Sequence, residues 1–204
     1  MIEHWSRNIA REVTSKFPKE EVYTCASGVS PSGVVHAGNF RDVITSDAIY
    51  RSLIALGKPA RLLFSWDDFD RFRKVPIGIS EDFLQHIGKP LSNVPDPEGE
   101  LPSYARRYEL QFEESLKKAG INPIIKYQSR EYESGRYDSM IKYCLNHRRD
   151  IARILAQFKT QGMSEQDIES YFPISVYSRF TGKDNTKVLS FDGESTHEVV
   201  HEFE

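Results

Sequence analysis

Apolar and polar positions in the first third of the chain predict a strand, a loop, a helix and a second strand. Residues 21–26 (EVYTCA) are rich in β-branched and aromatic side chains, and residues 27–33 (SGVSPSG) are typical of turns. Apolar residues then recur at helical spacing from Asn39 until Gly57, which favours a helix end. Residues 61–66 (RLLFSW) form a nearly continuous apolar run, typical of a strand covered on both faces.

The middle of the chain repeats this order. Residues 104–116 have helical apolar spacing before Gly120, and residues 123–127 (PIIKY) predict a third strand. Strands that alternate with helices indicate the α/β class, with an open parallel sheet and helices on both faces. Residues 137–158 keep a helical rhythm over about six turns, which predicts one long helix whose apolar stripe lies in the core.

The last part of the chain has a different pattern. Residues 173–180, 186–191 and 196–203 resemble strands joined by turn-forming segments, which predicts an antiparallel meander. We therefore expect one α/β domain over residues 1–162 and a small β module over residues 163–204. Because the last predicted strand is half apolar and has no closing turn, we also expect the chain to be a piece of a longer protein.

Composition narrows the class of protein. The 204 residues carry 27 basic and 30 acidic side chains, a formal charge of −3, and 39% of the residues are hydrophobic. This is a globular composition without a membrane-spanning stretch, so we expect a cytosolic protein that binds neither membrane nor DNA. A general coat of basic residues is excluded, but a local patch that meets phosphate is not. Arg106 and Arg107 are candidates for such a patch, and a solvated helix face explains them equally well.

The loop after the first predicted strand is the first candidate site. Ligands of open α/β sheets bind at the carboxyl ends of the strands. There, Gly33 and Gly38 would let a ligand approach the backbone, and the helix that begins near Asn39 would offer N–H groups to phosphate. His36 lies close enough to Asn39 to share that ligand. The alternative is that Asn39 merely caps the helix and His36 is a loop histidine.

An acidic cluster after the second predicted strand is the other candidate site. Asp67, Asp68 and Asp70 are three carboxylates within four positions, and they raise one another's pKa unless cations compensate. Arg71 and Arg73 are near enough in sequence to do so, and a surface network of modest value is the alternative. Both candidate sites fall at the same edge of the predicted sheet, which favours a functional cleft.

Several motifs, in order and spacing, resemble one enzyme family. His36-Ala37-Gly38-Asn39 is similar to the HIGH signature of class I aminoacyl-tRNA synthetases, with asparagine in place of the final histidine. The other motifs are His4-Trp5, residues 27–45 (SGVSPSGVVHAGNFRDVIT), 66–76 (WDDFDRFRKVP), 90–99 (PLSNVPDPEG) and Ser103-Tyr104-Ala105. Over essentially the whole chain, this set resembles the class I lysyl-tRNA synthetases, the archaeal type also found in some bacteria.

The resemblance implies a Rossmann-type (HUP-like) domain of a ligase that activates L-lysine with ATP and then esterifies tRNA-Lys. ATP would bring Mg²⁺ with it. By matching positions, ATP would be held by Ser32, Gly33, His36, Gly38 and Asn39, with His36 and Asn39 acting in catalysis. L-Lysine would be bound by Gly28, Ser30, Asp67 and Asp68. Neighbours on a strand point to opposite sides, so the sequence leaves open which of Asp67 and Asp68 faces the ligand.

The residues are chemically suited to this reaction. Adenylation needs no protein nucleophile, because the substrate carboxylate attacks the α-phosphate and the protein supplies alignment and charge stabilisation. The sequence accordingly has no Ser-His-Asp or Cys-His arrangement. A buried carboxylate selects an ammonium group strongly, because a substrate without that cation leaves the carboxylate unpaired.

The chain also departs from the family pattern. These 204 residues contain no KMSKS-type segment, and we expect no helical anticodon-binding domain among them. Where several members carry paired cysteines the chain has Ser178 and Thr181, so we expect no structural zinc and no other bound metal. We therefore expect an amino-terminal portion that binds ligands weakly and catalyses little. One alternative is a stand-alone, catalytically weak paralogue that binds lysine or tRNA, and another is a nucleotidyltransferase without preference for lysine.

Overall fold

The computed structural model describes residues 3–200, which form two compact units. The first unit comprises residues 3–70 and 91–129, and the second comprises residues 71–90 and 130–200. These compact units do not coincide with the domain boundary that we expect at residue 162. That boundary remains a prediction. No helix among the described residues is both long and apolar enough to cross a bilayer.

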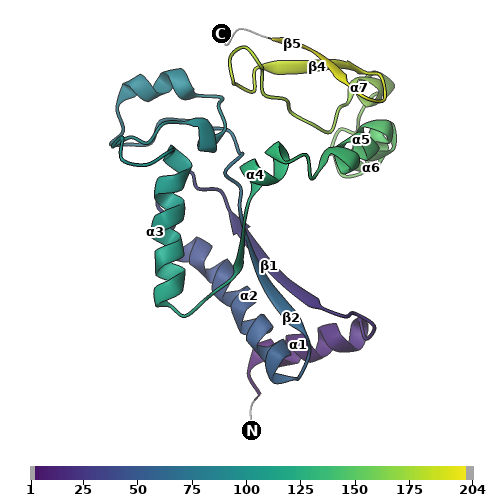
Figure 1. The fold of residues 1–204 in the computed structure, drawn as a ribbon. Coiled ribbons are helices and arrows are strands. Elements are labelled where there is room, and N and C mark those ends of the chain that lie inside the picture. Colours follow the sequence, from purple (N-terminus) through teal and green to yellow (C-terminus); the bar gives the residue numbers. More distant parts are fainter. Residues whose placement is uncertain (1–2, 201–204) are drawn as a thin grey trace. The chain divides into compact units, whose positions relative to one another are not determined.

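A three-stranded parallel sheet organises the first unit (Figure 1). Its strands lie in the order β1 (Tyr23–Val29), β2 (Ala60–Trp66) and β3 (Ile124–Tyr127). Val29 is paired with Trp66, and Trp66 with Tyr127, so the three strands end level with one another. The carboxyl ends of all three strands therefore meet at one edge, as the sequence predicts.

Three helices pack on one face of this sheet. They are α1 (Trp5–Lys16), α2 (Ala37–Ala55) and α3 (Tyr104–Lys118). Successive side chains of a strand point to opposite faces, and alternate β2 residues form a buried cluster with apolar residues of α2 and α3. The cluster contains Leu62, Phe64, Trp66, Val43, Phe112 and Leu116. We call this side the helix-covered face.

The opposite side of the sheet has no helix packed on it within the first unit. Thr24 and Ala26 of β1 are exposed there, and Ile124 of β3 is 52% exposed. We call this side the open face. The α/β class and the parallel sheet flanked by helices are confirmed, and the three helices described for the first unit lie on the helix-covered face. A run as apolar as residues 61–66 could not reveal this, because the sequence does not show which partner covers each face.

The second unit contains a β-hairpin and short helices. The hairpin pairs β4 (Thr186–Phe191) with β5 (Thr196–Val200) in antiparallel fashion. The helical elements are α5 (Asp138–Asn146), α6 (Arg148–Ala156), α7 (Glu165–Ser170) and the 3₁₀ turn η1 (Glu81–His86). Residues 71–90 join this unit through an ion pair of 2.8 Å between Arg71 and Asp184 and through Asp184 N–H, which donates to the Gly88 carbonyl. Helix α4 (Gln128–Glu133) follows β3 and leads from the first unit into the second.

The prediction of a single long helix over residues 137–158 is wrong. The segment forms α5 and α6, which are separated at His147, where the backbone has φ −101° and ψ 18°. Most of the predicted apolar stripe is also exposed: Met140 is 61% exposed, Ile154 56% and Phe158 82%, whereas Leu145 is buried. Helical spacing establishes that one side of a segment is apolar, but it does not establish that another element covers that side.

The predicted three-stranded meander is a two-stranded hairpin. Residues 173–180 form no strand, because Ser178 N–H donates to the Lys183 carbonyl and Gly182 N–H donates to the Ser178 carbonyl, which folds the segment into a local turn. The predicted last strand is observed as far as Val200, and residues 201–203 lie outside the described part. Helix α1 was not predicted.

Candidate functional site

The ends of β1 and β2 are joined directly at the carboxyl edge of the sheet. Asp67 N–H donates to the Val29 carbonyl over 3.1 Å, so the chain leaves β2 beside the point where it leaves β1. One position earlier, Gly28 is paired with Ser65. A Cβ atom on Gly28 would lie 2.9 Å from the Ser65 carbonyl oxygen, too close for any other residue without a backbone shift. The edge thus brings Gly28, Ser30 and Asp67 together.

The loop after β1 leads into the N-terminus of α2. His36 is the N-cap of this helix, because its Nδ1 accepts a hydrogen bond from Gly38 N–H over 3.1 Å. Asn39 is the third residue of the helix, so the alternative in which Asn39 caps it is wrong. The sequence favoured Asn39 as the cap because asparagine is among the preferred N-cap residues and histidine is not.

This N-terminus is accessible to a ligand. Ser32, His36 and Gly38 are exposed, and Gly33 has open space where a side chain would stand. The Tyr104 hydroxyl of α3 donates to the Ser32 carbonyl over 2.8 Å and holds the loop from one side. A helix of 19 residues places a positive partial charge at its N-terminus, which is suited to phosphate.

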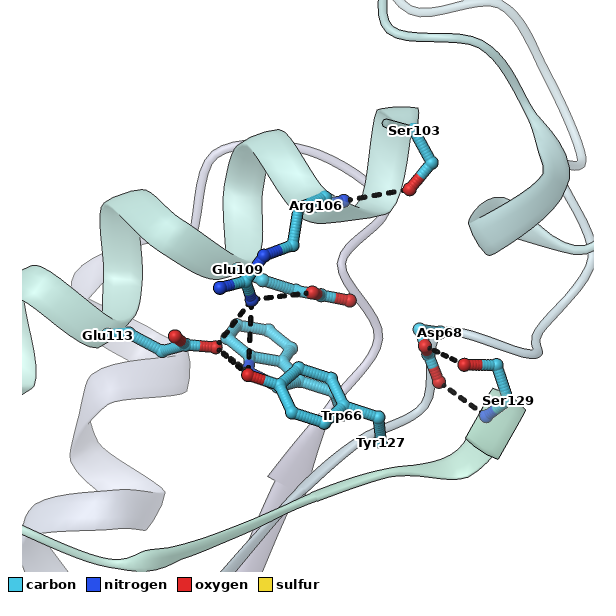
Figure 2. Close-up of polar contacts among 8 residues, drawn as sticks. All are labelled: Trp66, Asp68, Ser103, Arg106, Glu109, Glu113, Tyr127 and Ser129. Atoms are coloured by element: carbon cyan, nitrogen blue, oxygen red, sulfur yellow. Dashed lines mark hydrogen bonds and ion pairs between the residues drawn. The ribbon is translucent and has the colours of Figure 1, made fainter. Parts of the chain in front are cut away.

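Asp67 and Asp68 point to opposite sides of the sheet. Asp68 lies on the helix-covered face and is only 3% exposed, and its carboxylate accepts hydrogen bonds from Ser129 N–H (2.8 Å) and the Ser129 hydroxyl (Figure 2). Asp67 is partly exposed and accepts a bond of 3.2 Å from the Ser65 hydroxyl. The carboxylate of Asp68 is therefore engaged with the start of α4, whereas Asp67 faces the side away from the helices.

The environment of Asp67 acts on its charge in two directions. Partial burial raises the pKa of the Asp67 carboxyl, and the negative charges of Asp70 and Asp68 raise it further, while the hydrogen bond from Ser65 lowers it. A bound cation would favour the charged form of the carboxylate for the same electrostatic reason. The site is thus electrostatically suited to an ammonium group.

A network of charged side chains lies behind Asp68 on the helix-covered face (Figure 2). Arg106 Nη1 donates to Glu109, Glu113 and the Tyr127 hydroxyl, each over 3.1 Å. The Glu113 carboxylate also accepts from Tyr127 (2.8 Å) and from the indole N–H of Trp66 (3.1 Å). Arg106 is therefore held by a buried carboxylate, Glu109, and a partly buried one, Glu113. Neither a phosphate patch nor a solvated helix face describes these contacts of Arg106.

Glu109 is the most perturbed carboxyl of this network. It is 3% exposed, and burial raises its pKa to about 7, with the charges of Asp68 and Glu113 adding to the effect and Arg106 opposing it. Sequence reasoning missed Glu109, although its spacing of three from Arg106 and four from Glu113 places all three on one side of a helix. That spacing alone cannot separate a buried network from a solvated surface.

Two further polar residues at the edge were also missed. Gln128, the first residue of α4, donates from Nε2 to the Ser65 hydroxyl over 2.7 Å. Ser65 lies inside an apolar run and Gln128 follows another strand, so only the pairing of the strands brings them together. Among residues 3–200, no three His, Cys, Asp or Glu side chains are grouped so that they could hold a metal ion.

The sequence was compared with known proteins. Residues 3–202 match the family described as tRNA synthetases class I (K). Over 191 residues the chain is 38% identical to a lysine–tRNA ligase of Borrelia garinii subsp. bavariensis, an alignment that covers 93% of this chain and 36% of that protein. It is 38% identical over 193 residues to lysine–tRNA ligase 1 of Methanosarcina acetivorans, covering 94% and 35%. With a lysine–tRNA ligase of Thermococcus kodakarensis the identity is 35% over 191 residues, covering 94% and 36%.

The chain thus spans about a third of the length of the curated relatives it matches. The matched third contains both candidate sites of the first unit, the loop that leads to α2 and the residues that follow β2.

Proposed function

Because this chain belongs to the class I lysyl-tRNA synthetase family, we propose that it carries binding groups for the ATP-dependent activation of L-lysine, the reaction that precedes ligation to tRNA-Lys. In this reaction a carboxylate oxygen of lysine attacks the α-phosphorus of ATP, lysyl-adenylate forms, and pyrophosphate leaves. The tRNA 3′-terminal hydroxyl then takes the lysyl group and AMP leaves.

One observation carries this proposal. The bond from Asp67 N–H to the Val29 carbonyl places the acidic residue next to the start of the loop that ends at His36. In our proposal, an amino acid whose ammonium group contacts Asp67 would direct its carboxylate along this loop toward the N-terminus of α2. Adenylation needs the two reacting groups to be held close together.

We assign the lysine side of the site to Gly28, Ser30 and Asp67. Asp67 would bind an ammonium group. Gly28 lets β1 lie close against Ser65, because a Cβ atom there would be 2.9 Å from the Ser65 carbonyl oxygen. Asp68 supports this side indirectly, because its carboxylate is buried against Ser129 and holds the start of α4. Its role in our proposal is positioning rather than contact with lysine.

We assign the ATP side to Ser32, Gly33, His36, Gly38 and Asn39. The exposed N-terminus of α2 would bind phosphate, and Mg²⁺ would enter with the nucleotide. His36 and Asn39 would stabilise charge that develops on the phosphate. A donor of this kind contributes about 10²- to 10³-fold in rate.

The experiment is a titration of the ¹⁵N-labelled chain, followed by NMR. L-Lysine is compared with L-norleucine, which lacks the ε-ammonium group, and with 6-aminohexanoic acid, which lacks the α-ammonium group. We expect L-lysine to bind most tightly, and the weaker of the two analogues identifies the ammonium group that Asp67 contacts. MgATP should shift the amides of residues 32–39, and His36→Ala and Asn39→Ala should weaken that response.

Asp67→Asn is the decisive variant, with Asp70→Asn as its matched control, because Asp70 is an exposed carboxylate three residues away. Loss of a hydrogen-bonded charge should weaken lysine binding by about 10- to 100-fold. Equal affinity of Asp67→Asn and the unchanged chain would reject the lysine assignment. Equal affinity for a panel of other amino acids would favour a nucleotidyltransferase with another acceptor.

A further inference from the structure

The open face carries a line of polar groups at the ends of β2 and β3. Ser65 points away from the buried Trp66, and Asp67 and Gln128 lie on the same side, as their hydrogen bonds to Ser65 show. Gly28, the partner of Ser65 in β1, leaves this side of β1 without a side chain. Strands β1 and β2 and the residues that directly follow β2 and β3 thus contribute to one small polar group.

The hydrogen bonds in this group run in one direction. Gln128 Nε2 can only donate, so the Ser65 hydroxyl accepts from it, over 2.7 Å. A hydroxyl has a single proton, and the proton of Ser65 is directed to Asp67 Oδ1 over 3.2 Å. The amide therefore orients the hydroxyl, and the hydroxyl donates to the carboxylate.

We propose that Gln128 is a positioning residue for lysine recognition, because its amide fixes the Ser65 hydroxyl as the donor that holds Asp67 toward the substrate's ammonium group. This inference rests on the proposed function, since it concerns the same carboxylate. Gln128 is not a catalytic residue in this proposal, because it acts on the ligand through Ser65 and Asp67.

A purely structural role for Gln128 would be to tie the end of β3 to β2. The two roles differ in what Gln128→Glu does. Glutamate has nearly the same size, but its carboxylate accepts, so it would take the Ser65 proton away from Asp67. A tie between strands would survive this change, whereas the bond to Asp67 would not.

The first test needs no ligand. The carboxyl carbon of Asp67 is followed by ¹³C NMR during a pH titration of the unchanged chain, Ser65→Ala and Gln128→Glu. Because the hydrogen bond from Ser65 lowers the pKa of Asp67, both variants should raise that pKa. Gln111→Glu is the control, since it adds the same charge at an exposed position of α3 and should leave Asp67 unchanged.

The double variant separates the hydrogen bonds from the added charge. If the relay operates, Gln128→Glu should change the Asp67 titration less in the Ser65→Ala background than in the unchanged chain. Strictly additive shifts would mean that the negative charge at position 128 acts through space, and they would overturn the relay.

The second test measures affinity. Ser65→Ala and Gln128→Glu should each weaken L-lysine binding by about 10-fold, while MgATP affinity stays the same. A relay confirmed by titration together with no lysine binding by any form would reject the proposed function and, with it, this role of Gln128. Normal lysine binding in both variants would reject the role of Gln128 alone.

Discussion

The two candidate sites at the edge of the sheet are built differently. On the acidic side, Asp68 is buried and hydrogen-bonded to Ser129, and the buried Glu109 and the partly buried Glu113 both accept hydrogen bonds from Arg106. On the loop side, Ser32, His36 and Gly38 are exposed, and the contacts that we describe are to the backbone. The acidic side is thus fixed before a ligand arrives, whereas the loop side offers N–H groups that a phosphate can approach. In our proposal the rigid acidic side selects a cation, and the more accessible loop side binds the nucleotide.

Asp68→Ala tests the rigid side with the largest expected effect. The change leaves the buried N–H and hydroxyl of Ser129 without their acceptor, so we expect the free energy of unfolding to fall by about 3 to 4 kcal/mol. Urea denaturation followed by circular dichroism measures it. Asp70→Ala removes an exposed carboxylate and should change stability by about 0.5 kcal/mol or less. Similar values for the two variants would show that the acidic side is no more rigid than a surface loop.

Glu109→Gln tests the same side through pH. Since the pKa of Glu109 is raised to about 7 in the folded protein, this residue stays protonated on folding at a pH where the unfolded chain has lost the proton. Stability from this group is therefore greatest below about pH 4.5 and is lost as the pH rises to about 7, by about 2 to 3 kcal/mol in all.

The measurement compares unfolding free energies of both proteins from pH 4.5 to 8. The glutamine variant has no such proton, so its stability should lack this decline, and the difference between the two curves isolates Glu109. Parallel curves would mean that the pKa of Glu109 is not raised despite its burial.

Tyr104→Phe tests the tie between the two sides. It removes the hydroxyl that donates to the Ser32 carbonyl, and we expect a loss of about 1 kcal/mol. Hydrogen exchange should become faster at residues 32–35 and stay the same in β2. Tyr143→Phe, at an exposed position of the second unit, is the control. Unchanged exchange in the loop would show that this bond does not restrain it.

Ser32→Ala has the smallest expected effect on folding. The side chain is exposed, and the carbonyl that Tyr104 uses remains, so stability should stay within about 0.5 kcal/mol. MgATP affinity should fall instead, which calorimetric titration measures. A loss of stability without a loss of affinity would reverse the contrast between the two sides.

The sheet could be predicted from the sequence because each strand is marked by a pattern within its own segment. The strands that end at Val29, Trp66 and Tyr127 are marked by apolar and β-branched runs, and parallel pairing follows from the helices between them. The alternation of side chains along a strand also implies that Asp67 and Asp68 diverge. It does not show which of them is buried, because that depends on Ser129, which is 61 residues away.

Most of what was missed depends on such distant partners. Gln128 meets Ser65 across two strands, and no pattern within either segment indicates it. Helices α5 and α6 show the opposite error, since their apolar spacing suggested burial that the fold does not provide. Apolar spacing is a property of a single helix, whereas burial requires a second element that packs against it.

The position of Trp66 makes its fluorescence a useful property of the molecule. Its indole is fully buried, donates to Glu113 and directly precedes Asp67, whereas Trp5, the only other tryptophan, is 47% exposed. With Trp5 replaced by phenylalanine, the tryptophan emission of this protein would come from one residue, which directly precedes the acid assigned to the substrate. The chain therefore contains its own fluorescent reporter for the arrival of a cation.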